Sequence, residues 1–303
     1  MTLLALKIDV DTYRGTRVGV PRLVEILKQH EAGATFLFSL GPDHTGRAIT
    51  RVFRKGFMNK VSRTSVREHY GLKTLMYGTL LPGPDIGRAC AAIMRQVRDD
   101  GFEVGIHCWD HVKWQDKVAS AGAAWTEEQM RLSLDRFEEI FDESARAHGA
   151  AGWQTNVHAL RLTQRLGFDY SSDARGHCPF VPVIRAEIAA CPQLPTTLPT
   201  LDELLGRDGI DAGNVAGHIL ELTAEPPAAG HVYTLHAELE GGKLSGVFEE
   251  LLTGWKAQGY TLCALRDLYQ TLDMEQLPRH EIGMGEVPGR SGQLAVQGEE
   301  FLA

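Results

Sequence analysis

Short apolar runs alternate with longer amphipathic segments along most of this 303-residue chain, and this alternation restricts its fold more than any other feature. The apolar runs predict strands at residues 3–8, 34–40, 102–107, 150–155, 168–172, 232–235 and 260–265. The segments between them predict helices at residues 20–30, 86–100, 126–148, 156–166 and 247–258. Strands that alternate with helices are typical of βαβ units, so we expect an α/β fold with a parallel sheet.

The regular alternation does not extend over the whole chain. Residues 175–229 are rich in Pro and Gly and are less periodic, and after Leu277 the pattern fades into Gly, Glu and Gln. A chain of this length can bury one large core. We therefore expect one domain over residues 1–275 and an irregular C-terminal tail over residues 276–303.

Composition and charge exclude several classes of protein. Apolar residues make up 43% of the chain and charged residues 23%, which is ordinary for a soluble globular protein. No run of about 18 apolar residues occurs, and the first residues lack the basic region of a signal peptide. Five cysteines without a CxxC spacing favour a reducing cytoplasm over disulfide bonding. The net charge of −8 argues against general nucleic-acid binding.

Positive charge is concentrated in residues 45–84. This segment holds eight basic residues and one acid, a local charge of +7, whereas the rest of the chain carries −15. Phe, Met, Leu and Tyr side chains lie between the charges. Such a mixture is typical of an element that lies on an anionic bilayer, so we expect a basic amphipathic insertion that contacts an anionic membrane surface. A solvated insertion packed on the rest of the fold is the alternative.

Polar side chains stand at or just beyond the carboxyl ends of the expected strands: Asp9, Asp11, His107, Trp153, Asp173 and His236. In a parallel α/β barrel these strand ends share one face, and that face carries the chemistry. Residues that are far apart in the sequence are therefore expected to meet at one site.

His107 and His111 are four residues apart and are candidate metal ligands. If the chain is helical there, both imidazoles lie on one helix face, with Cβ atoms roughly 5–6 Å apart. A catalytic zinc usually takes three protein ligands, so we expect a third from Asp9 or Asp11. This donor set suits zinc, cobalt, nickel or manganese alike. A solvated or internally hydrogen-bonded histidine pair is the alternative, and Cys108 is expected to be buried rather than to bind metal.

Four stretches together resemble the polysaccharide deacetylase (NodB-homology) family: residues 8–12 (IDVDT), 105–111 (GIHCWDH), 169–173 (DYSSD) and 234–236 (TLH). The resemblance runs from about residue 3 to residue 270, and its paired acids and HxxxH are its specific part. It implies a distorted (β/α) barrel. It also implies one divalent metal ion that supports hydrolysis of N-acyl groups on sugars.

The resemblance implies a role for each residue of the site. The metal would be bound by three side chains: Asp11, His107 and His111. Asp9 would be the general base that takes a proton from water. His236 would be the general acid that protonates the leaving amine, with Asp173 holding its imidazole. These roles suit amide hydrolysis, because a metal activates water and a histidine supplies a proton near neutral pH.

Two features depart from the family pattern. Val10 separates two acids that are adjacent in the family, although residues i and i+2 of a strand face the same side. The third family motif carries an arginine that pairs with the base, but residues 150–156 hold none. We consider Arg175 as its replacement. Trp153, Arg175, Arg54 and Lys55 are candidates for substrate binding.

Residues 152–154 (GWQ), 195–200 (PTTLPT) and 234–238 (TLHAE) add a narrower resemblance to one branch of the family. That branch removes formate from 4-deoxy-4-formamido-L-arabinose linked to undecaprenyl phosphate, during the lipid A modification that gives polymyxin resistance. The resemblance implies a peripheral deformylase at the cytoplasmic face of the inner membrane. The alternatives are a deacetylase of N-acetyl sugars or peptidoglycan, and a non-catalytic protein that binds lipid phosphates.

Overall fold

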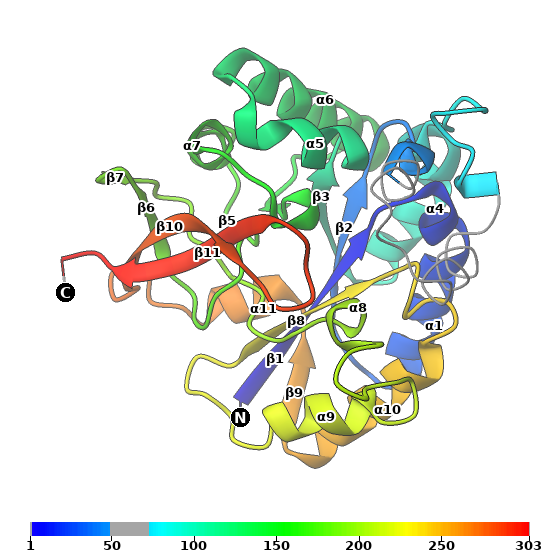
Figure 1. The fold of residues 1–303 in the computed structure, drawn as a ribbon, viewed down its shortest axis with the longest axis vertical. Helices are drawn as coiled ribbons and strands as arrows, with labels where there is room; N and C mark the ends of the chain where they lie inside the picture. Colours follow the sequence, from blue (N-terminus) through cyan, green and yellow to red (C-terminus); the bar gives the residue numbers. More distant parts are fainter. Residues whose placement is uncertain (1, 49–72, 303) are drawn as a thin grey trace.

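A curved sheet of parallel strands lies at the centre of the computed structural model, which describes residues 2–48 and 73–302 (Figure 1). Its strands are β1 (Thr2–Val10), β2 (Thr35–Ser39), β3 (Glu103–Cys108), β4 (Ala147–His148), β5 (Tyr170–Ser171), β8 (His231–His236) and β9 (Tyr260–Cys263). They lie in the order β5-β4-β3-β2-β1-β8, with β9 also paired to β1, and every pair is parallel. The expected parallel α/β fold is confirmed.

Most of the helices surround the outer side of this sheet (Figure 1), whereas α11 (Leu265–Gln270) packs with Ala5 on the opposite side. The other helices are α1 (Val20–Gln29), α4 (Ile86–Asp99), α5 (His111–Lys117), α6 (Ala123–Phe141), α7 (Val157–Arg165), α8 (Leu201–Leu204), α9 (Val215–Leu222) and α10 (Ser245–Ala257), with a short π-helix η1 (Gly15–Gly19) and short 3₁₀ helices η2 (Val118–Ser120) and η3 (Ala151–Trp153). In α1, Leu23, Ile26 and Leu27 recur at helical spacing and are fully buried. Pro21 lies in the first turn, where no N–H is needed.

The residues of β1 alternate between the two faces of the sheet, one apolar throughout and the other charged near the carboxyl end of the strand. Leu6 and Ile8 are fully buried in the main core together with residues of the surrounding helices. The alternate residues face the other side, as the two-residue period of a strand requires. Ala5 joins a second apolar cluster there, and Lys7 and Asp9 follow it. The inner face of the sheet therefore carries buried charges toward its carboxyl end, and these need partners.

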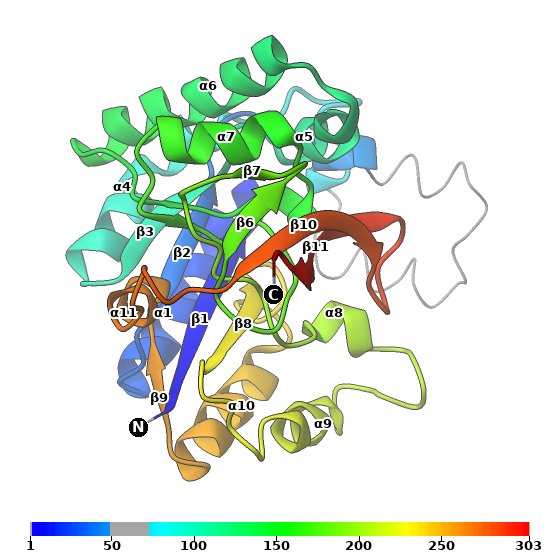
Figure 2. The ribbon, with the colours of Figure 1, turned by 90° about the vertical axis from the view of Figure 1, so that its left-hand side faces the viewer.

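A second sheet lies on the inner side of the first (Figure 2). Its strands are β6 (Val181–Ile184), β7 (Glu187–Ile188), β10 (Arg279–Glu286) and β11 (Gln293–Glu300), in the order β11-β10-β6-β7. The irregular tail expected over residues 276–303 is therefore wrong, because β10 and β11 form an antiparallel hairpin and β10 pairs in parallel with β6. Gly and Glu disfavour strands, but pairing with an existing strand overrides that propensity.

The helix expected over residues 126–148 has different ends. It begins at Ala123, three residues earlier than expected. Its last residue is Phe141, because the next residue, Asp142, has a left-handed conformation with φ of 56° that cannot continue an α-helix.

The strand expected over residues 150–155 is also wrong. β4 ends at His148, and the next residues form the short turn η3. Within this turn Gly152 has φ of 61°, and a Cβ there would meet the side chain of Gln115. A left-handed residue that approaches a neighbour so closely favours glycine and interrupts an extended strand.

The basic insertion expected at residues 45–84 falls mainly on residues 49–72, which lie outside the described residues, as do Arg54 and Lys55. Of its described part, Arg47 donates a hydrogen bond from Nε to the Gly78 carbonyl. Among residues 2–48 and 73–302, no helix combines the length and the apolar content needed to cross a membrane.

Candidate active site

Asp11, His107 and His111 lie together at the carboxyl edge of the central sheet. The Nε2 atom of His107 is 3.2 Å from one Asp11 carboxylate oxygen, and the Nε2 atom of His111 is 3.3 Å from the other. One potential ligand atom from each of the three residues lies within 4.8 Å of the others. The histidines do not share a helix, since His107 lies in β3 and His111 begins α5. The turn between the strand and the helix brings their rings to 5.4 Å.

A hydrogen bond orients the His107 imidazole, and a helix cap fixes the backbone at His111. The Nδ1 atom of His107 lies 2.7 Å from the Gly149 carbonyl, which can only accept, so Nδ1 carries a proton and Nε2 of the neutral ring keeps its lone pair. His111 is held by the start of α5, where Asp110 caps the helix by accepting from the backbone N–H of Lys113. An imidazole fixed through its other nitrogen is a common feature of metal sites.

The electrostatics of this group fit a bound cation. Burial acts to raise the pKa of Asp11, but His111 and His107 hold it well below its ordinary value. Burial opposes protonation of His107, yet Asp9 and Asp11 raise its pKa. Burial lowers the pKa of His111. One carboxylate oxygen of Asp9 and one of Asp11 are buried without a hydrogen-bond partner among the described residues. Carboxylate and imidazole donors of this kind suit a divalent metal.

Asp9 pairs with Lys7, a residue that the sequence reasoning overlooked. The Nζ atom of Lys7 is 3.5 Å from the Asp9 carboxylate and donates a hydrogen bond to the Ser172 carbonyl. Arg175 was considered as a replacement for the missing arginine, and the structure does not support this. Its guanidinium instead pairs with Glu203 and donates to the Leu198 carbonyl. The spacing could have identified Lys7, because it shares a strand face with Asp9.

His236 ends β8 and has a carboxylate neighbour, but this is Asp202 and not the expected Asp173. The Nδ1 atom of His236 is 3.8 Å from Asp202, whose other oxygen lies 2.9 Å from the Arg290 guanidinium. Burial acts to lower the pKa of His236, but Asp202 and Asp11 raise it. Asp202 lies in α8 and Arg290 between β10 and β11, so no periodic pattern could have identified them.

Asp173 is fully buried and contacts His148 instead. Its carboxylate accepts hydrogen bonds of 2.8 Å from the His148 ring and from the backbone N–H of Ala150. Burial alone would raise the pKa of Asp173, but His148 lowers it. These contacts flank Gly149, whose carbonyl orients His107. Asp173 therefore supports a candidate ligand and does not touch the candidate acid.

Trp153 does not have the open ring expected of a residue that binds sugar. It is 1% exposed, and its indole N–H donates to the Thr196 hydroxyl. Three cations lie 4.8–5.3 Å from its ring centre: Lys7, Arg175 and Arg290. Such cation–π contacts hold charged side chains in a buried place. The prediction that Trp153 and Arg175 bind substrate is not supported, because both have internal partners.

Two further buried acids follow β8, and the sequence reasoning missed both. Glu238 accepts hydrogen bonds from the backbone N–H and the hydroxyl of Thr12. Its burial and, to a smaller extent, the nearby charge of Asp11 raise the pKa of Glu238 to about 8. Glu240 accepts from the backbone N–H of His236, and burial raises its pKa to about 7. Both stand in the stretch 236–240 (HAELE), where the alternation of polar residues was the available signal.

Comparisons with known sequences show which protein family this chain resembles. Residues 5–171 match the polysaccharide deacetylase family. A curated protein from Shewanella sediminis (strain HAW-EB3), named probable 4-deoxy-4-formamido-L-arabinose-phosphoundecaprenol deformylase ArnD, is 39% identical over 297 residues. The match covers 98% of this chain and 95% of that protein.

Solved structures share the fold at much lower identity. A polysaccharide deacetylase from Mycobacterium smegmatis superposes with a TM-score of 0.63 at 15% identity, covering 94% of this chain and 96% of that one. An acetyl xylan esterase from Clostridium thermocellum, solved with a cobalt ion, gives 0.52 at 13% identity and covers 91% and 97%. The barrel type expected from the sequence is therefore confirmed. The chain belongs to the polysaccharide deacetylase family, and as such it is a hydrolase of amide bonds.

Proposed function

We propose that this chain is a metal-dependent deformylase that hydrolyses the N-formyl group of 4-deoxy-4-formamido-L-arabinose linked to undecaprenyl phosphate. The observation that carries the proposal is the meeting of Asp11, His107 and His111 next to Asp9. The substrate is taken from the Shewanella sediminis relative, whose name states it and whose likeness spans nearly the whole chain. The same likeness supports a place in lipid A modification and polymyxin resistance.

Asp11, His107 and His111 would hold the divalent cation, and zinc, cobalt, nickel and manganese all suit these donors. When bound, such a cation lowers the pKa of a water ligand and polarises an amide carbonyl. The residue that takes the proton from the attacking water is Asp9, which lies 3.7 Å from the His107 ring. As water oxygen bonds to the formyl carbon, the carboxylate of Asp9 becomes protonated.

His236 completes the reaction. When the C–N bond breaks, His236 gives its proton to the departing nitrogen, so the products are the free amine and formate. The neighbouring Asp202 favours the protonated imidazole and thereby keeps the acid charged up to higher pH. A proton donor is required because an unprotonated amine anion is a very poor leaving group.

The lipid part of the substrate gives the basic segment a role. A polyprenyl phosphate stays in the bilayer, so the enzyme must reach the membrane surface. The local charge of +7 in residues 45–84 supports peripheral binding at the cytoplasmic face, and Arg54 and Lys55 are the candidates for binding the substrate phosphate.

Formate release from the synthetic lipid-linked formamido sugar tests the proposal, with the matched acetamido sugar as competitor. We expect formate, loss of turnover on chelation, and its return with a divalent metal. Acetate release with no formate would favour the N-acetyl sugar deacetylase instead. Binding of the lipid without either product would favour a non-catalytic lipid-phosphate binding protein.

Three variants separate the role of the general base from that of the metal ligands. Asp9→Asn should retain the metal but lose at least about 100-fold in kcat, because a general base contributes at least that much. His107→Ala and the less buried His111→Ala should lose turnover and the metal ion bound at Asp11, His107 and His111. Metal content by mass spectrometry and formate assays give the readouts, with His218→Ala as a control away from the site. A fully active Asp9→Asn enzyme would refute the assignment of the base.

A further inference from the structure

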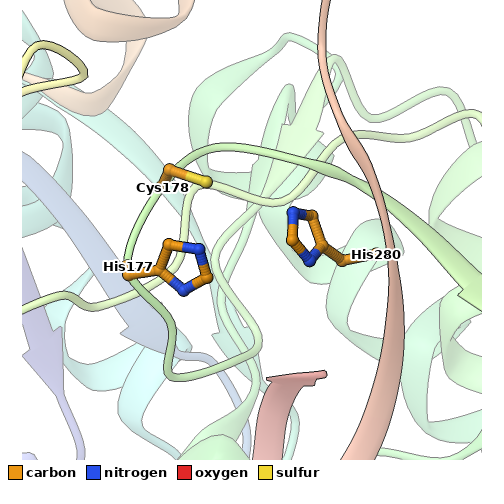
Figure 3. A group of neighbouring side chains, drawn as sticks. All are labelled: His177, Cys178 and His280. Carbon is orange, nitrogen blue, oxygen red and sulfur yellow. The ribbon is translucent and has the colours of Figure 1, made fainter. Parts of the chain in front are cut away.

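A second group of metal-binding side chains lies in the smaller sheet, away from the candidate active site. His177 and Cys178 precede β6, and His280 lies in β10. One ligand atom from each residue lies within 4.8 Å of the other two. Figure 3 shows the three side chains facing one another from the loop and from the strand. We propose that His177, Cys178 and His280 bind a second, zinc-type transition-metal ion.

Hydrogen bonds from β11 hold all three residues in place. The Nδ1 atom of His280 lies 2.9 Å from the Gly298 carbonyl, so it donates there and the lone pair of Nε2 stays available. The side chain of Gln297 accepts from the backbone N–H groups of His177 and Cys178 and donates from Nε2 to the Cys178 sulfur, at 3.3 Å. Partners behind the ligands that fix tautomer and orientation are typical of metal sites.

The chemistry of the donors selects the ion. Two imidazole nitrogens and one sulfur favour zinc and its neighbours over the oxygen-seeking magnesium and calcium. Binding breaks the S–H bond of Cys178, forms a sulfur–metal bond and releases the proton to solvent. Three protein ligands leave a fourth position for water, which the exposure of His177 permits.

Such an ion would fasten the β10–β11 hairpin to the loop before β6. His177 and Cys178 belong to the loop, whereas His280 belongs to the hairpin. The same hairpin carries Arg290, which pairs with Asp202 beside His236. The second ion would therefore stabilise the hairpin whose Arg290 holds Asp202 next to His236. It would do so without sharing a ligand with the site of Asp11, His107 and His111.

Cobalt titration of the metal-free full-length protein, made without a histidine tag, tests the proposal. Cobalt bound to a thiolate gives a charge-transfer band in the near ultraviolet, whereas carboxylate and imidazole ligands give none. We expect two equivalents of cobalt, enough for both sites, to produce the band in the wild type, and one equivalent to produce it in His107→Ala, which lacks a ligand of the first group. Cys178→Ser should lose the band, and His177→Ala should weaken cobalt binding at least 10-fold.

Two controls make the result decisive. Cys108→Ala should keep the band, since the sulfur of Cys108 contacts Ser39 and lies outside the proposed ligands. Zinc should raise the Tm of His107→Ala but not that of the double variant His107→Ala/Cys178→Ser. A wild type without the band, or a band that persists in Cys178→Ser, would overturn the proposal. Failure of the deformylase assay would leave this test unaffected, because it measures no turnover.

Discussion

Lys7 and Asp9 form a buried ion pair on the inner face of β1. Both side chains are almost completely enclosed, and the Lys7 ammonium also lies 5.3 Å from the Trp153 ring centre. A buried charge needs a counter-charge. We infer that Lys7 positions Asp9, the task that the family gives to an arginine in its third motif. In this chain the positive charge is that of Lys7, which lies on the same strand, β1, as Asp9.

Lys7→Met tests this inference, because methionine keeps the apolar stem and removes the charge. Without the ammonium, the Asp9 carboxylate loses the charged partner that holds it in place, so it is less well positioned to accept a proton from water. We expect kcat for formate release to fall about 100-fold, with metal content unchanged. The exposed Lys117→Met is the control, and a Lys7→Met enzyme with the kcat of the wild type would contradict the inference.

Asp202→Asn tests the link between His236 and its carboxylate neighbour. Burial acts against protonation of His236, but Asp202 raises its pKa, so the general acid stays protonated to higher pH. Activity falls as pH rises through that pKa. Removing the charge of Asp202 lowers the pKa of His236, so the fall in activity should begin at lower pH. The exposed Asp208→Asn should leave the profile unchanged, whereas an unaltered alkaline limb in Asp202→Asn would exclude the pairing.

At the scale of elements, the strongly periodic segments were predictable and the connections were not. β1, β2 and β3 are apolar runs that pattern alone identifies, and the clustering of Asp9, Asp11 and His107 followed from the shared edge of a parallel sheet. The turn between β3 and α5 was not predictable, since four-residue spacing fits a helix equally well. Asp202 and Arg290 come from segments without periodicity and reach His236 only through tertiary contacts.

The segment from β4 to η3 shows how one element supports another. Asp173 holds His148 and Ala150, and the carbonyl between them orients His107. Asp173→Asn should cost about 3 kcal/mol of unfolding free energy, because it breaks a buried charged pair. It should also weaken metal binding about 10-fold. Urea unfolding and metal titration measure the two effects.

The pH dependence of stability gives a further check on Asp173. Because the folded-state pKa of Asp173 is lowered, its ionised pair stabilises the protein above the ordinary carboxyl pKa and loses this effect as pH falls through the lowered value. The stability gap between wild type and Asp173→Asn should therefore close in acid. The exposed Asp169→Asn should show no gap. A variant of normal stability that loses only kcat would return Asp173 to the catalytic role that the resemblance implied.

At the scale of the whole molecule, charge is divided between an acidic body and a basic segment. Residues 45–84 carry +7 against −15 for the remainder, so the segment alone should meet an anionic surface while the body is repelled. We expect the protein to sediment with vesicles containing phosphatidylglycerol at low salt and to leave them at high salt, as a screened electrostatic contact should. Neutral phosphatidylcholine vesicles should bind it much less.

Four basic residues that carry no substrate role allow a sharp test: Arg51, Lys60, Arg63 and Arg67. Replacing them with Gln removes about 4 kcal/mol of attraction, at about 1 kcal/mol for each charge near the surface. The quadruple variant should lose vesicle binding and turnover of the lipid-linked sugar in vesicles, yet release formate normally from a water-soluble formamido sugar. The matched variant with the same change at Arg88, Arg95, Arg98 and Lys117 should bind vesicles like the wild type. Equal binding by both variants would show that the attraction resides in the fold as a whole and not in this segment.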